Sequence, residues 1–365
     1  MKYFVKTLVE PTLDYELVLG FREGLSVVRN NFVEKKMGFI DRTGNVVIPV
    51  ELSDGFTASS KPRVYYGFSE GLSPVLKEGK CGFMNKKGEI VIKPEYDSVY
   101  GFNEGIALAE KEGKWGYIDR NGKVLIPFEY EWADQFSEGL AGVKKDGKFG
   151  YIDKTGEVAI PFGLEFDYID IFQEGLARVM TGKGEVQNVQ RLENESDEEF
   201  SHRALAAIIE STKNERWGFI DRTGKIQIPV DYNGVSRFSE GFAVSFKDGR
   251  KCYIDKMGNM PFETPFDSLT NYKEGLAAVK KESKWGFIDR NGEIVIPFEY
   301  DLGESGSYFS AGLAVVKINN KWGYIDKHGN AVTPFEYDSA GYVCEGLAVV
   351  EKDGKYGIIE INETE

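Results

Sequence analysis

The chain has 365 residues, a hydrophobic fraction of 41% and a net charge of −14. Its 45 lysines and arginines are mixed with 59 acidic residues and form no long basic run, which argues against nucleic acid or an anionic membrane as a partner. No apolar run reaches the roughly 18 residues of a membrane-spanning helix, so no span is expected.

The first residues resemble the end of a unit that recurs later in the chain. Residues 11–15 begin with proline and end with tyrosine, like residues 127–130. The first ten residues lack the apolar segment of a secretory signal peptide. We therefore expect a cytoplasmic protein.

A short sequence pattern then recurs nine times. Each copy has a Glu-Gly-Leu segment, a Lys-Trp-Gly segment and a Val-Ile-Pro segment, with substitutions, and each segment is predicted to be a strand. The spacings between the first glycines are 47, 34, 34, 36, 66, 34, 37 and 34. Such a recurring period predicts stacked units that share a continuous core. These glycines are Gly24, Gly71, Gly105, Gly139, Gly175, Gly241, Gly275, Gly312 and Gly346.

Each copy reads as a three-stranded antiparallel meander. Pairs such as Asp146-Gly147 are typical of two-residue hairpin turns. An Asp-Arg/Lys-x-Gly segment, as in Asp119 to Gly122, is typical of a type I turn. The strands are apolar on both faces, which indicates that neighbouring units cover them. The glycine after each tryptophan indicates close approach of another backbone or ring.

We predict an all-β fold in which about nine such meanders stack as an open β-superhelix, or solenoid. The alternative is a closed β-propeller, because the two ends of the chain have the parts of one further unit. The open form is favoured because a unit of this length is short for a four-stranded blade and nine blades exceed the usual number. Residues 1–365 form a single array. Trp115, Trp217, Trp285 and Trp322 are expected to be buried.

The chain resembles the WG-repeat (KWG-repeat) proteins of bacteria over nearly its whole length. Trp-Gly stands at 115–116, 217–218, 285–286 and 322–323, and other residues replace the tryptophan elsewhere. The sixth copy, residues 250–255, departs most from the pattern and is expected to be a local defect. The resemblance implies a repeat module and no particular activity.

Two insertions interrupt the period. Residues 51–67 are rich in Ser, Gly and Pro and read as a loop. Residues 180–215 include a capping box at 196–199, followed by apolar residues at helical spacing. We predict one amphipathic helix near 197–211, either folded onto its own repeats or available to a partner.

Little in the sequence indicates catalysis. The chain has only two histidines, His202 and His328, and no glycine-rich phosphate-binding loop. The Asp-x-Asn-Gly turns lack the further carboxylates of a calcium loop. Cys81, Cys252 and Cys344 are far apart in sequence and are expected to be free thiols. We therefore expect no enzyme activity, no cofactor and no bound metal. The repeated Glu of Glu-Gly and the Lys before Trp-Gly suggest Glu–Lys pairs between successive units.

The function that these features favour is a non-catalytic scaffold that binds a protein or peptide on a face of the array. The alternative is a module that binds a carbohydrate or cell-wall polymer through aromatic side chains. We expect a monomer. The candidate partner-binding residues are Phe200, Leu205, Ile208, Ile209, Tyr65, Tyr66 and Trp132.

Overall fold

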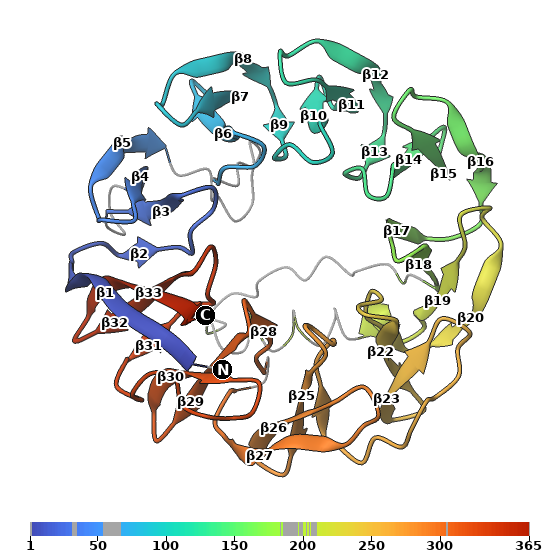
Figure 1. The fold of residues 1–365 in the computed structure, drawn as a ribbon. Coiled ribbons are helices and arrows are strands. Elements are labelled where there is room, and N and C mark those ends of the chain that lie inside the picture. The colour runs from blue at the N-terminus through green and yellow to red at the C-terminus, as the bar shows by residue number, and fades with distance from the viewer. Residues whose placement is uncertain are drawn as a thin grey trace.

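The fold is a closed ring of nine small antiparallel sheets (Figure 1). It was obtained as a computed structural model, which describes residues 2–30, 35–53, 67–182, 184, 196, 200, 201, 203, 205, 210–303 and 306–364. Six sheets have four strands and three sheets have three strands within this part of the chain. Each sheet is a blade, and the blades follow one another around the ring in chain order (Figure 1).

The first five blades have the following strands. Blade 1 has β2 (Leu17–Val18), β3 (Leu25–Arg29), β4 (Lys36–Asp41) and β5 (Val46–Ser53), and blade 2 has β6 (Leu72–Lys77), β7 (Lys80–Asn85) and β8 (Ile90–Tyr96). Blade 3 has β9 (Ser98–Val99), β10 (Ala107–Lys111), β11 (Lys114–Ile118) and β12 (Val124–Tyr130). Blade 4 has β13 (Trp132–Ala133), β14 (Leu140–Lys145), β15 (Lys148–Asp153) and β16 (Val158–Leu164), and blade 5 has β17 (Tyr168–Gln173), β18 (Leu176–Thr181), β19 (Arg216–Ile220) and β20 (Ile226–Tyr232).

The remaining blades complete the ring. Blade 6 has β21 (Gly234–Val235), β22 (Phe242–Lys247) and β23 (Arg250–Asp255), and blade 7 has β24 (Ser268–Leu269), β25 (Ala277–Lys281), β26 (Lys284–Ile288) and β27 (Ile294–Tyr300). Blade 8 has β28 (Phe309–Ser310), β29 (Leu313–Ile318) and β30 (Lys321–Asp326). Blade 9 has β31 (Ser339–Ala340), β32 (Leu347–Lys352) and β33 (Lys355–Thr364), together with β1 (Lys2–Leu13) from the other end of the chain.

The prediction of an open superhelix is wrong, and the alternative of a closed propeller is confirmed. Strand β1 pairs with β33 in antiparallel register, from Lys2 opposite Thr364 to Leu13 opposite Tyr356. The N-terminal strand thus supplies the outermost strand of blade 9, next to the last strand of the chain. This pairing joins blade 9 to the segment that enters blade 1 and closes the ring.

The unit also has a part that the sequence pattern did not suggest. Within the described part of the chain, eight blades have a short strand at the inner edge of the sheet, and blade 2 lacks it. The Glu-Gly pair that follows is a two-residue turn and not part of a strand. In blade 1, the backbone groups of Arg22 and Leu25 bond to each other across Glu23-Gly24. Because the inner strand is so short, a unit of the observed length suffices for a blade.

The glycine of the Trp-Gly pair lets the outermost strand approach. A Cβ on Gly286 would lie 2.6 Å from the backbone oxygen of Ile296, and one on Gly116 would lie 2.8 Å from that of Ile126. A real Cβ cannot be so close to a backbone oxygen. The glycine is therefore required wherever the outermost strand pairs at this point.

Replacing this glycine is expected to weaken the blade. In Gly286→Ala, the new methyl group must push β27 away from β26, and overpacking of this kind costs about 1–3 kcal/mol. The matched control is Gly101→Ala, where the nearest atom is the Cβ of Ser69, 3.7 Å away. Urea unfolding should show a lower midpoint for Gly286→Ala alone. Equal midpoints for Gly286→Ala and Gly101→Ala would mean that β27 does not lie so close to Gly286 in solution.

Blade 6 confirms the expected local defect. Here Cys252 stands where other blades have the glycine, and no strand within the described residues pairs with the outer edge of β23. A side chain at this position occupies the space that the outermost strand needs. Pro261 and Pro265 also remove backbone donors from that segment.

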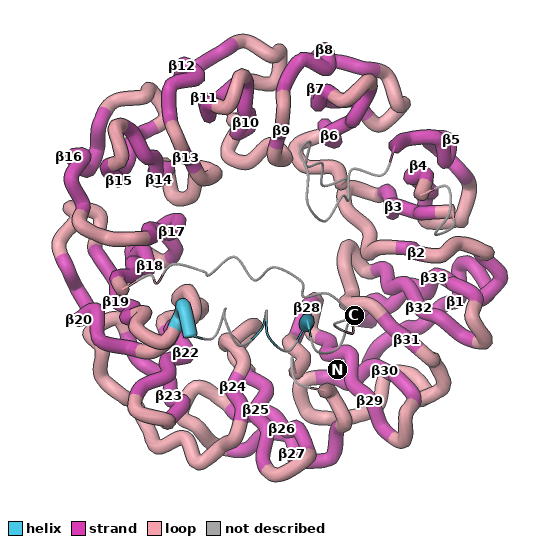
Figure 2. Tube along the Cα trace, turned by 180° about the vertical axis from the view of Figure 1, so that it is seen from behind, coloured by secondary structure: helices cyan, strands magenta, loops and turns pink. Residues whose placement is uncertain are grey.

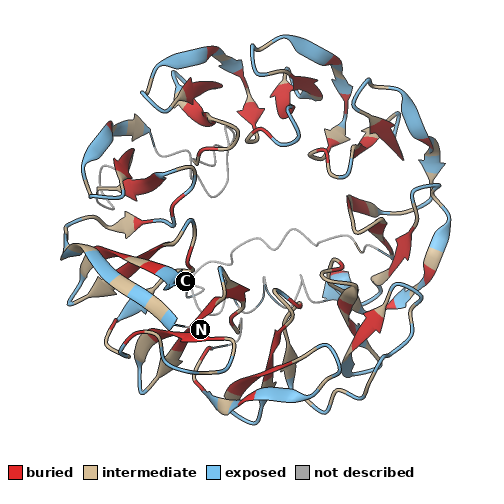
Figure 3. Cartoon of the chain, in the orientation of Figure 1, coloured by how far each residue is buried: buried red, intermediate tan, exposed pale blue. Residues whose placement is uncertain are grey.

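The core consists of the inner strands of each blade, whereas the outermost strands are largely exposed (Figure 3). Trp285 is only 1% exposed, as predicted. Trp115, Trp217 and Trp322 are half-buried and pack against the core clusters, so the prediction of full burial is wrong for these three. Their rings cover the edge of the core instead of filling its centre.

The predicted helix is found in the insertion between β18 and β19. Residues 200, 201, 203, 205 and 210–212 are helical, and Figure 2 draws helix in cyan. The other residues of the predicted span 197–211 lie outside the described residues. The prediction of a loop over residues 51–67 is wrong for residues 51–53, which belong to β5, and residues 54–66 lie outside the described residues.

Candidate binding channel

The inner strands of the blades surround the centre of the ring, and one residue of each blade varies there. This variable residue is followed directly by a buried residue that lies two positions before the Glu-Gly turn. Examples of the buried residue are Phe21 in blade 1 and Phe102 in blade 3. None of these nine residues is buried. We call them the channel positions: Gly20, Gly67, Gly101, Gln135, Ile171, Arg237, Asn271, Tyr308 and Tyr342.

A cavity of about 990 Å³ is lined by the inner parts of blades 8, 9, 1, 2, 3 and 4. Six of the nine channel positions line it, from Tyr308 in blade 8 through blade 1 to Gln135 in blade 4. A cavity of this size can hold several side chains of a peptide or a small molecule. Its wall combines exposed backbone at the glycines with aromatic rings at Tyr308, Tyr342 and Tyr100.

Two of the lining rings form a stacked pair. The ring centroids of Tyr308 and Tyr342 lie 3.9 Å apart, with 15° between the ring planes. The Nζ of Lys273 lies 4.9 Å from the centroid of Tyr308, a favourable cation–π position. Burial raises the pKa of both tyrosines. Both hydroxyls therefore stay protonated near neutral pH, and the pair presents an uncharged aromatic surface.

The Glu-Gly turns hold the blades in their relative positions. The carboxylate of Glu70 accepts a hydrogen bond of 3.1 Å from the backbone N–H of Gly105 in the next blade. Equivalent bonds are donated by the backbone N–H of Gly71 to Glu23, Gly139 to Glu104, Gly175 to Glu138, Gly241 to Glu174, Gly275 to Glu240, Gly312 to Glu274 and Gly24 to Glu345. The bond from Glu345 in blade 9 to Gly24 in blade 1 crosses the junction at which the ring closes.

The expected Glu–Lys pairs exist, but with a different lysine. The partner is the Lys or Arg of the Asp-x-x-Gly turn of another blade, as in Lys154–Glu104 at 2.9 Å. The Lys before Trp-Gly pairs instead with an aspartate farther along the chain, as in Lys284–Asp301 at 2.7 Å. The sequence could not distinguish these lysines, because both recur along the chain.

A second set of contacts joins the blades beside the channel. The residue after the buried aromatic is often serine, and its hydroxyl donates to a backbone oxygen of the next blade. Ser137 donates to Phe172 at 2.7 Å and Ser239 to Tyr272 at 2.7 Å. The Asn103 amide donates to Phe136 in the same way. These bonds join the inner edges of the blades concerned.

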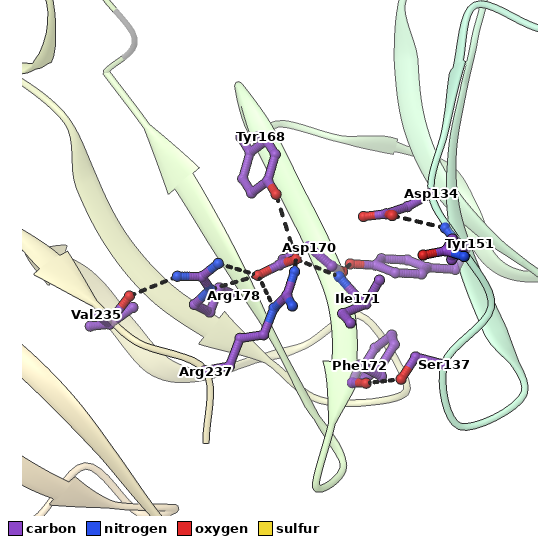
Figure 4. A network of polar contacts seen from close by, with 11 residues as sticks. Asp134, Ser137, Tyr151, Tyr168, Asp170, Ile171, Phe172, Arg178, Val235 and Arg237 are labelled. Carbon is purple, nitrogen blue, oxygen red and sulfur yellow. Dashed lines mark hydrogen bonds and ion pairs between the residues drawn. The ribbon is translucent and has the colours of Figure 1, made fainter. Parts of the chain in front are cut away.

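A buried ion cluster lies at the junction of blades 5 and 6 (Figure 4). Asp170, with a side chain 0% exposed, pairs with Arg178 at 2.5 Å and with Arg237 at 2.6 Å. Burial alone would raise the pKa of Asp170, but the hydrogen bonds and charges of the two arginines outweigh it and lower that pKa. Arg178 also lies over the ring of Trp217. The cluster therefore joins Arg237 of blade 6 to the buried carboxylate of blade 5.

Asp170→Asn should destabilise the ring, because it leaves two arginines beside a neutral amide. Removing one partner of a buried ion pair costs about 3–5 kcal/mol. The folded pKa of Asp170 is lowered, so its contribution is full above the ordinary aspartate pKa of about 4 and is lost as pH falls through the folded value. Urea unfolding should show a gap between wild type and Asp170→Asn at pH 7 that narrows below about pH 4.

The matched control is Arg222→Ala, which removes an exposed pair with Glu138. Exposed pairs contribute about 0–1 kcal/mol. If Asp170→Asn and Arg222→Ala had equally small effects, the cluster would be solvated in solution.

The residues predicted to bind a partner do not gather at the channel. Trp132 is half-buried and packs edge-on against Phe149 and Tyr168. Within the helical segment, Phe200 is half-buried and Leu205 is 53% exposed. Ile208, Ile209, Tyr65 and Tyr66 lie outside the described residues.

The channel positions were missed, although the sequence contains a signal for them. Aligning the nine units places Gly, Gly, Gly, Gln, Ile, Arg, Asn, Tyr and Tyr before residues that are aromatic in eight units and Val343 in the ninth. A position that varies while its neighbours repeat is not needed for stacking. Without the inner strand in the predicted unit, nothing indicated that this position faces the channel.

The described residues contain no helix with the length and apolar composition needed to cross a membrane. In the same part of the chain, no three His, Cys, Asp or Glu side chains cluster in a way that would hold a metal ion. Cys81, Cys252 and Cys344 are free and belong to three different blades. Burial raises the pKa of the Cys81 thiol to about 11, which makes it unreactive near neutral pH.

The fold is similar to solved structures at low sequence identity. A structure described as "the eukaryotic initiation factor" has a TM-score of 0.56 and 10% identity, with 93% of each chain covered. BamB from Moraxella catarrhalis has a TM-score of 0.42 and 11% identity, covering 83% of this chain and 99% of that one. At such identities only the fold is comparable. No curated protein matches the chain in sequence.

The family assignment rests on the repeat itself. The "WG containing repeat" matches residues 37–61, 82–115, 115–149, 149–183, 217–250, 253–285, 285–322 and 322–356, which is more than half of the chain. The matched segments include the Trp-Gly strands and the turns that build the blades. The chain belongs to the family of proteins with the WG containing repeat.

Proposed function

We propose that this protein is a non-catalytic scaffold that binds a segment of a partner protein, or a peptide, in its central channel. The observation that carries the proposal is the cavity of about 990 Å³ and its lining by six of the nine channel positions. Three of these six residues are glycine, one is glutamine and two are tyrosine, so the wall has a bare part in blades 1 to 3 and an aromatic part in blades 8 and 9. A wall with a bare part and an aromatic part suits a ligand that has both a backbone and an apolar group.

The chemistry of the wall favours a peptide. The exposed backbone at Gly20 can form hydrogen bonds with another backbone, and the tyrosine pair offers apolar contact. Two of the lining amides already have partners, because Gln135 donates to Gly101 and Asn103 donates to Phe136. Such a wall suits binding by shape and does not resemble a set of convergent catalytic groups. The three free cysteines support the cytoplasm as the compartment.

The stacked tyrosines also support a second candidate, a carbohydrate ligand, because flat aromatic surfaces suit sugar rings. The two candidates differ in what the wall must supply. A neutral oligosaccharide needs free hydrogen-bonding side chains beside the rings, whereas a peptide can use the backbone at the glycines.

A displayed library of random peptides, selected on the intact protein, tests the proposal. We expect selected peptides to bind the wild type and to lose affinity for Tyr342→Ala, which removes half of the stacked pair. The matched control is Met257→Ala, which truncates a side chain 68% exposed and outside the cavity lining. Failure to select peptides, or peptides insensitive to Tyr342→Ala, would refute binding in the channel. Binding of neutral oligosaccharides instead would favour the carbohydrate candidate.

A further inference from the structure

We propose that the peptide bound in the cavity is acidic and that Arg22 pairs with its carboxylate. This inference rests on the proposed function and adds the chemical class of the partner. It starts from the position of Arg22, directly after the buried Phe21, where blades 5, 7 and 9 have Gln173, Lys273 and Cys344. Blades 2, 4, 6 and 8 have serine at this position, and each hydroxyl donates to the next blade: Ser69, Ser137, Ser239 and Ser310.

Arg22 does not take over that structural role. Its side chain is exposed, and within the described residues its guanidinium forms no hydrogen bond, ion pair or ring contact. By contrast, Arg178 and Arg237 are both paired with Asp170. In the described part of the chain, Arg120, Arg216, Arg250 and Arg290 likewise form no ion pair with a carboxylate, but of these five arginines only Arg22 lines the cavity. Arg22 therefore has donors available for a ligand.

The wall beside Arg22 is bare. The channel positions of blades 1, 2 and 3 are all glycine, whereas blades 4 to 9 have side chains there. A Cβ built on Gly67 would lie 3.8 Å from the Cδ of Arg22, so the arginine stem extends along this glycine. A larger residue at position 67 would compete with Arg22 for space. The glycines thus leave room both for the arginine and for a ligand backbone against the wall.

The cavity lining offers one group that an anionic partner can bind. Among the described residues that line it, Arg22 is the only Lys or Arg and Glu351 is the only acid. A guanidinium in a partly enclosed cavity binds a carboxylate through paired hydrogen bonds, which are stronger there than in bulk water. The stacked pair of Tyr308 and Tyr342 lines the same cavity and offers an apolar surface for the rest of the segment. A short acidic peptide with a flat apolar residue satisfies both features.

The peptides selected on the wild-type protein provide the probes. We expect them to be enriched in Asp and Glu relative to the starting library. Fluorescence anisotropy with one labelled peptide should show about tenfold or greater weakening for Arg22→Gln, because a hydrogen bond to a charged group is lost. Arg22→Lys should keep part of the affinity. Arg250→Gln is the matched control, since it removes the same charge from an exposed site outside the cavity lining.

Three results would overturn the inference, and they separate it from the proposed function. In the first result, the selected peptides lose affinity for Tyr342→Ala but are not enriched in Asp and Glu and keep their affinity for Arg22→Gln. This result would refute the role of Arg22 and leave channel binding in place. Equal weakening by Arg22→Gln and Arg250→Gln would show a general charge effect and no specific pair. A library that yields no channel-binding peptide would refute both proposals. Circular dichroism of each variant confirms that the exposed substitution leaves the ring folded.

Discussion

Deleting residues 2–13 should open the ring and lower the free energy of unfolding by about 2–5 kcal/mol, because apolar burial is lost. The deletion removes β1, the outermost strand of blade 9. Val5, Val9 and Leu13 of this strand are half-buried against core residues of blades 1, 8 and 9. A fully buried aliphatic side chain contributes about 1.5–3 kcal/mol, and these three contribute about half of that amount each.

The loss should be measured as a lower midpoint of urea unfolding. The control is the double substitution Lys2→Ala and Lys6→Ala, which changes exposed residues of the same strand and keeps its backbone pairing. We expect the control to unfold like the wild type. A deletion that unfolds like the wild type would mean that β1 contributes little and that the ring is held closed in another way.

Trp285→Ala should destabilise blade 7 by about 3–5 kcal/mol, the usual cost of removing a large core aromatic side chain. Trp285 is 1% exposed and donates a 2.7 Å hydrogen bond from Nε1 to the backbone oxygen of Gly303. The substitution removes the packed ring and leaves that oxygen without its donor. Thermal unfolding should show a clearly lower Tm.

Trp115→Ala provides the comparison within the same repeat position. Trp115 is half-buried at the edge of its core cluster, so its removal leaves a smaller cavity. We expect a smaller loss than for Trp285→Ala. Equal losses of stability for the two variants would show that Trp115 and Trp285 are equally buried in solution.

Local parts of the unit could be predicted because each has its own sequence signal. The Asp-x-x-Gly turns form as expected, with Asp119 accepting bonds from the backbone N–H groups of Asn121 and Lys123. The glycine of Trp-Gly is required by the outermost strand, and the matching ends of the chain do complete one unit.

Closure of the ring could not be decided in the same way. It depends on the angle between successive blades, which is set by contacts such as the bond from Glu70 to Gly105. These contacts join residues of different units, and the Glu-Gly pair read as part of a strand in the sequence. In the structure the glutamates have positive φ values of 50° to 56°, which turn the chain and aim each carboxylate at the next blade.

The cavity could be predicted least. Its wall consists of residues from six blades, and no single residue type is common to all the channel positions. Gly67 and Tyr308 are equivalent by their place in the unit and differ in every other respect. Only the closed ring brings Tyr308, Arg22 and Tyr100 to one cavity, although they come from distant parts of the sequence.

Closure of the ring is tested most directly by a disulfide between the two ends of the chain. Phe4 and Asn362 are exposed and lie opposite each other in the pairing of β1 with β33, where antiparallel Cα atoms are about 4.5–5.5 Å apart. After mild oxidation of the Phe4→Cys, Asn362→Cys variant, peptide mass spectrometry should identify a bond between residues 4 and 362 in monomeric protein at high yield. An open superhelix holds its two ends far apart, so a variant that stays reduced, or that links only between molecules, would contradict the closed ring.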